Sequence, residues 1–88
     1  YLERGDLFAN LRNLKMAAKD YSRVINLISE YDWQRYLPYQ KRGLVYGYMG
    51  QYQKSFADLN TAKKLNPRMT KQIDRAIAFF KKRASGKK

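Results

Sequence analysis

The segment YQKRGLVYGYMGQYQKSFADLNTAKKLNP, residues 39–67, predicts two helices joined by a tight turn. In its first half, Tyr39, Gly43 and Tyr46 recur at spacings of four and three, which places them on one helix face. Gly50 then interrupts the pattern, because a residue without a Cβ readily adopts the left-handed conformation that ends many helices. The second helix is expected to end at Asn66-Pro67, since the residue before a proline is disfavoured in the helical region.

The second helix of this segment carries a face of small and apolar residues. Ser55, Leu59 and Ala62 again lie four and three residues apart. Because Gly43, Ser55 and Ala62 are small, the two helices can approach closely, and Leu59 fills the space that remains together with Tyr46. The segment therefore predicts a closely packed helical hairpin.

The spacing in this hairpin resembles the tetratricopeptide repeat, a unit of roughly 34 residues with an aromatic, Leu-Gly, Tyr, a small–aromatic–small triplet and Pro. The residues that match the pattern are Tyr39, Gly43, Tyr46, Ser55, Ala62 and Pro67. Arg42 stands where the family usually has leucine, and Leu59 stands where an aromatic is usual. The resemblance implies a repeat unit over residues 36–67 and a right-handed solenoid of antiparallel helical hairpins.

The first part of the chain repeats this arrangement at an offset of 38 residues. The corresponding pairs are Tyr1 with Tyr39, Arg4 with Arg42, Gly5 with Gly43, Phe8 with Tyr46, Ala17 with Ser55, Asp20 with Asp58, Tyr21 with Leu59, and Val24 with Ala62. These are the architectural positions of the hairpin, so we expect an all-α fold with a first unit over residues 1–31. Its second helix is predicted over residues 15–30.

The third predicted element is an end helix over residues 70–83 that caps the array, because a terminal repeat needs a polar outer face. Its apolar face is Ile73, Ala76, Ile77 and Phe80. Residues 84–88 are predicted to form a basic tail. In the linker between the two units, Trp33 is predicted to pack against the helices rather than to bind a ligand.

The composition argues against an enzyme and against bound cofactors or metals. Histidine and cysteine are absent, which removes the commonest general base and the thiolate metal ligands. The seven acidic residues are scattered over helix surfaces without a spacing that suggests acid–base catalysis. No apolar run reaches the roughly 18 residues of a membrane span.

The charge of the chain is strongly positive and uneven. The formal net charge is +12, and residues 61–88 contain ten basic residues and one acidic residue, Asp74. Such a field attracts anionic partners and raises their association rate. The simpler interpretation, a solvated basic face beside a basic tail, explains the same composition.

In the tetratricopeptide family the first helices of successive repeats line a concave groove. The resemblance therefore implies a groove floor at Leu44 and Tyr48, which we expect to be mostly exposed, with room made by Ala9 and Gly47. Lys71, Arg75 and Lys82 on the end helix would add positive charge. The predicted partner is a protein or peptide segment of acidic character.

One subfamily grips a peptide C-terminus with a clamp of basic and amide side chains, and this chain matches it only in part. Lys71 and Arg75 coincide with the last two clamp residues. Asp6 stands at an earlier clamp position, where a carboxylate would repel the peptide. The sequence therefore does not predict a clamp for a terminal carboxylate.

Two alternatives of other classes stay open at this point. A basic module rich in tyrosine could associate with RNA by charge and stacking, mainly through its C-terminal part, although no recognition motif is present. Since the sequence starts at Tyr1 rather than Met, the chain could also be a purely structural segment of a longer array. Steeply salt-dependent polyanion binding would favour the RNA-associated module. An upstream repeat in the parent sequence would favour the structural segment.

Overall fold

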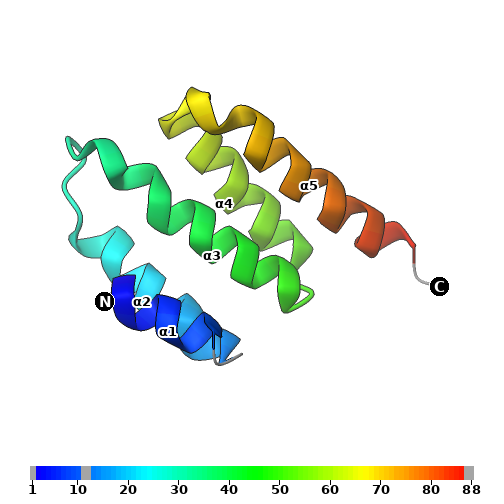
Figure 1. Ribbon diagram of the computed structural model, residues 1–88, viewed down its shortest axis with the longest axis horizontal. Coiled ribbons are helices and arrows are strands. Elements are labelled where there is room, and N and C mark those ends of the chain that lie inside the picture. Colours follow the sequence, from blue (N-terminus) through cyan, green and yellow to red (C-terminus); the bar gives the residue numbers. More distant parts are fainter. Residues whose placement is uncertain (1, 11–12, 87–88) are drawn as a thin grey trace.

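The computed structural model describes residues 2–10 and 13–86, and these form five α-helices. The helices are α1 (Leu2–Asn10), α2 (Leu14–Leu27), α3 (Tyr36–Tyr48), α4 (Tyr52–Leu65) and α5 (Thr70–Ser85), with 3₁₀ turns η1 (Trp33–Arg35) and η2 (Pro67–Met69). Figure 1 shows α1 and α2 on one side, α3 beside them, and α4 and α5 on the other side, with the two termini at opposite ends. The predicted all-α helical repeat is confirmed, and the handedness of the solenoid stays a prediction.

The hairpin α3–α4 has the structure that its sequence predicts. Gly50 adopts a positive φ of 81° in the turn. Helix α4 ends at Leu65, and the side chain of Asn66 accepts a hydrogen bond from the amide of Arg68 in the following turn. Gly43 is buried, and a Cβ atom there would lie 2.9 Å from Cγ of Leu59. The predicted close approach of the two helices is therefore confirmed.

Among the described residues the hydrophobic core has two layers, one between the two hairpins and one between the second hairpin and α5. Ala17, Ala18, Tyr21 and Val45 form one layer between α2 and α3. The other layer joins α4 to α5 and consists of Leu59, Ala62, Ile73, Ile77 and Phe80. Since the first hairpin packs against the second and the second against α5, the stability of this fold depends on the stacking of units.

Three predicted features differ in the structure. Helix α2 ends at Leu27 rather than at residue 30, because Ile28 is extended and the Ser29 hydroxyl accepts a hydrogen bond from the amide of Tyr31. Such local side-chain bonds compete with helix continuation. Helix α5 runs two residues beyond Arg83, to Ser85. The prediction for Trp33 is wrong: its side chain is 75% exposed, and Tyr36 packs against the core instead.

Some predictions fall outside the described part of the chain. Tyr1 and the side chain of Phe8, two of the repeat positions, lie outside it. The same holds for Lys87 and Lys88 at the end of the predicted tail. The boundaries of the two units and of the end helix stay predictions.

We expect Gly43→Leu to lower the thermal midpoint of unfolding. Added atoms would meet Leu59 and the Cβ of Asp58, which lies 3.2 Å from the position of a new Cβ. Overpacking of this kind costs about 1–3 kcal/mol. Ala57→Leu is the control, since it adds a leucine side chain at an exposed position of α4. An unchanged midpoint for Gly43→Leu would contradict the close-packing role of this glycine.

Candidate functional site

An arginine–aspartate pair fixes the geometry of the α3–α4 hairpin. The Arg42 guanidinium donates from Nε and Nη2 to the two carboxylate oxygens of Asp58, at 2.6 and 2.8 Å. Its Nη1 donates to the hydroxyl of Ser22 on α2 at 2.8 Å, which connects this hairpin to the previous one. The hydrogen bonds to Asp58 raise the pKa of Arg42. Arg42, the departure from the family pattern, is therefore a connecting residue between hairpins.

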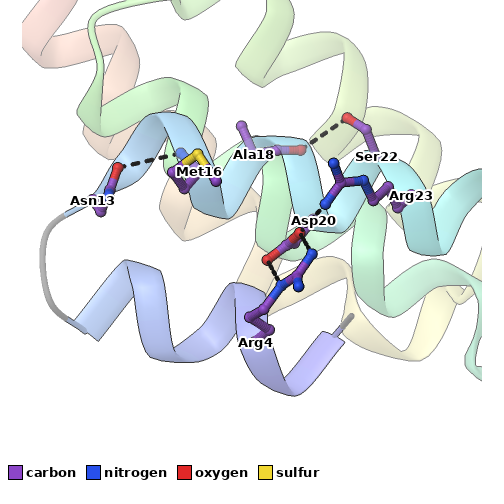
Figure 2. Close-up of polar contacts among 7 residues, drawn as sticks. All are labelled: Arg4, Asn13, Met16, Ala18, Asp20, Ser22 and Arg23. Atoms are coloured by element: carbon purple, nitrogen blue, oxygen red, sulfur yellow. Dashed lines mark hydrogen bonds and ion pairs between the residues drawn. The ribbon is translucent and has the colours of Figure 1, made fainter.

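The first hairpin contains the equivalent pair. Figure 2 shows the guanidinium of Arg4, from α1, and that of Arg23, from α2, at the carboxylate of Asp20. Arg4 donates two hydrogen bonds of 2.9 Å to Asp20, and Arg23 donates one of 2.9 Å. The hydrogen bond from Arg4 holds the pKa of this buried carboxyl below its usual value, against the effect of burial. Our sequence interpretation noted the shared offset of these residues but did not predict that they pair.

A second polar contact ties α1 to α2 and α3. The Tyr21 hydroxyl donates to Asp6 at 2.6 Å, and Lys41 Nζ donates to both Asp6 oxygens at 2.9 and 3.0 Å. Burial raises the pKa of Tyr21, and the Asp6 carboxylate raises it further. Asp6, which we expected to repel a peptide carboxylate, thus has Lys41 as its ion-pair partner.

Between the first hairpin and α3 lies a shallow cleft, which we call the inner cleft. Its volume is ≈ 220 Å³, and its lining residues are Ala9, Leu14, Tyr21, Lys41, Leu44, Val45 and Tyr48. The structure thus brings Leu44 and Tyr48 together on one surface. Tyr48 is 54% exposed, as expected, but Leu44 is half-buried because it packs against the core formed with α5.

Gly47 does not leave open space in the groove, contrary to the expectation. A Cβ atom at this position would clash with the ring of Phe80, which belongs to α5 and is fully buried. The absence of a side chain at Gly47 therefore admits Phe80 rather than a partner. This contact also sets the position of α5 against the end of α3.

Tyr48, which lines the inner cleft, also lies beside an exposed aromatic ring of α5. The ring of Phe79, 46% exposed, lies 6.3 Å from the ring of Tyr48, and the guanidinium of Arg83 lies 5.5 Å from the Phe79 centroid. Arg75 is one helical turn before Phe79, on the same side of α5. The partner-binding residues predicted from the sequence do not include Phe79 and Arg83, although Phe79 is an exposed apolar residue beside the buried stripe of α5.

The other two predicted basic residues, Lys71 and Lys82, are exposed on α5. With about 100° between successive residues, they lie roughly 60–80° around the helix from Phe79, toward the side opposite Ile73 and Ile77. Arg75 lies between them and Phe79 around the helix, so these three basic residues share one exposed side of α5.

Other kinds of site find no support in the part of the chain that the structure describes. Within residues 2–10 and 13–86, no group of three or more His, Cys, Asp or Glu side chains could hold a metal ion. No helix among the same residues is long and apolar enough to cross a membrane.

Comparison with known proteins identifies the central hairpin. Residues 38–69 match the family described as tetratricopeptide repeat, and this range covers α3 from Pro38 onward, α4 and η2. No curated protein and no solved structure matches the chain.

Proposed function

Because this chain carries a tetratricopeptide repeat over residues 38–69, and such repeats are generally non-catalytic protein–protein interaction modules, we propose that it binds a partner protein in the inner cleft. The partner segment is acidic and presents apolar side chains. Those side chains rest on Leu44, Tyr48 and Phe79, and its carboxylates face Arg75 and Arg83. The observation that carries the proposal is the exposed pair of rings, Tyr48 and Phe79, with the Arg83 guanidinium over the ring of Phe79.

The charge distribution supports an acidic partner. Four of the acidic residues, Asp6, Asp20, Asp58 and Asp74, are each bound by a basic side chain. The formal charge of the whole chain is +12. Lys71 and Lys82 add to the positive field on α5, which steers an acidic segment toward the cleft.

Binding is tested with a fluorescein-labelled peptide of twelve residues in which Glu and Asp alternate with Leu and Phe. Arg75→Glu is expected to raise the dissociation constant roughly ten- to hundredfold, because a charge-assisted contact contributes about 1.5–3 kcal/mol. Tyr48→Ala removes half of the aromatic pair and is expected to weaken binding several-fold without unfolding the domain. Fluorescence anisotropy measures both effects, and circular dichroism checks the fold.

Matched controls separate the cleft from general attraction. Tyr31→Ala removes a tyrosine that is 89% exposed outside the cleft, and Arg68→Glu reverses a charge on η2. Both are expected to bind the peptide nearly as the unaltered protein does. Equal losses for Arg75→Glu and Arg68→Glu would contradict the proposed site. Tighter binding of one RNA sequence than of scrambled controls would favour the nucleic-acid alternative.

A further inference from the structure

A second cleft lies between α2 and the α3–α4 turn; we call it the outer cleft. Its volume is ≈ 470 Å³, about twice that of the inner cleft. Residues of α2 form one wall, and Lys54 at the start of α4 stands on the other. Its floor consists of Met16, Tyr46 and Met49, all of them half-buried.

The rim of the outer cleft is basic. Lys15 and Lys19 are exposed one turn apart on α2, and Lys54 faces them from α4. No acidic side chain is among the described residues that line the cleft. Two cations also lie against the floor, since Lys54 Nζ is 5.5 Å and the Arg42 guanidinium 5.6 Å from the centroid of the Tyr46 ring.

We propose that the outer cleft is a second docking site, for an acidic segment of a partner protein that inserts one large apolar side chain. The apolar side chain rests on Met16 and Met49, whose flexible thioethers adapt to different shapes. Carboxylates on either side of it pair with Lys19 and Lys54. No described residue that lines this site also lines the inner cleft.

The chemistry of the floor distinguishes this partner from a nucleic acid. Base stacking needs exposed aromatic rings, whereas Tyr46 is half-buried and lies beneath Lys54. Flexible methionine side chains suit an aliphatic or aromatic amino acid. A second copy of this chain is also disfavoured as the occupant, because two molecules with a formal charge of +12 repel each other.

The three methionines of the chain give a site-resolved test. Met16 and Met49 line the outer cleft, while Met69 lies in η2 at the other end of α4. The protein is labelled with ¹³C in its methionine methyl groups and titrated with a ten-residue peptide of Glu and Asp around a single Phe. The Met16 and Met49 signals are expected to shift together while the Met69 signal stays in place. Equal shifts of all three signals, or none, would overturn the proposal.

Charge reversal provides the matched comparison. Lys19→Glu with Lys54→Glu alters the rim, and Lys64→Glu with Lys81→Glu alters the charge equally on exposed positions of α4 and α5. The rim variant is expected to raise the dissociation constant at least about tenfold, and the control less than about threefold. Equal effects of the two variants would mean that general electrostatic attraction explains the binding, and would overturn the proposal.

The apolar contact is tested separately with Met16→Gln, which changes a side chain outside the two core layers. It is expected to weaken binding of the Phe-containing peptide and to leave binding of an otherwise identical peptide with Gly in place of Phe unchanged. Tyr48→Ala is expected to leave intact the shifts of the Met16 and Met49 signals that the Phe-containing peptide causes. The proposals for the two clefts are therefore tested separately. Dimerisation that is lost in the rim variant, seen by sedimentation, would instead assign the outer cleft to a second copy.

Discussion

Phe80→Ala is expected to lower the free energy of unfolding by about 3–5 kcal/mol, the usual cost of removing a fully buried phenylalanine. The Phe80 ring occupies the space left by Gly47 and lies 5.2 Å from the ring of Tyr48 in an edge-to-face arrangement. It also lies 6.4 Å from the ring of Tyr52 on α4. A chain of this size has little stability to spare, so we expect α5 to separate from the rest of the array.

The neighbouring residue gives the matched control for this prediction. Phe79 is 46% exposed, and Phe79→Ala is expected to cost less than about 1 kcal/mol of stability while weakening binding at the inner cleft. Unfolding in urea measures both free energies, and amide hydrogen exchange shows whether protection is lost first in α5. Comparable losses for the two alanine variants would mean that Phe80 does not hold α5 in place.

A second large effect is expected from Asp58→Ala, which leaves the mostly buried Arg42 guanidinium without its carboxylate. Breaking a buried ion pair by removing one partner costs about 3–5 kcal/mol. The variant also frees Arg42 from the geometry that directs its Nη1 to Ser22. We therefore expect looser stacking of the two hairpins as well as a lower free energy of unfolding, measured by urea titration.

Two further variants test the cause of that loss. Asp74→Ala removes an exposed partner of Lys63, and surface pairs of this kind contribute about 0–1 kcal/mol. Arg42→Leu combined with Asp58→Ala removes both charges and places at position 42 the leucine usual in the family. This double variant is expected to be more stable than Asp58→Ala alone, because no unpaired charge stays buried. If it is not, the cost comes from packing around Asp58 rather than from the ion pair.

Local chemistry determined the parts of the fold that the sequence predicts correctly. Residues close in sequence determine the turn at Gly50 and the end of α4 before Asn66-Pro67. The helical period places small and apolar residues on one face of each helix, which predicts the contact between Gly43 and Leu59. The offset of 38 residues correctly aligned Arg4 with Arg42 and Asp20 with Asp58. Their pairing within each hairpin could have been predicted from that alignment.

Only the tertiary structure decided how the helices are rotated against one another, and with it the composition of the inner cleft. The helical period fixes the angle between Phe79 and Lys71 on α5, but not which of them faces α3. That choice follows from the insertion of Phe80 at Gly47, a contact between residues 33 positions apart, which directs Phe79 toward Tyr48. The exposure of Trp33 and the pairing of Asp6 with Lys41 have the same origin, since both depend on how the two hairpins pack against each other.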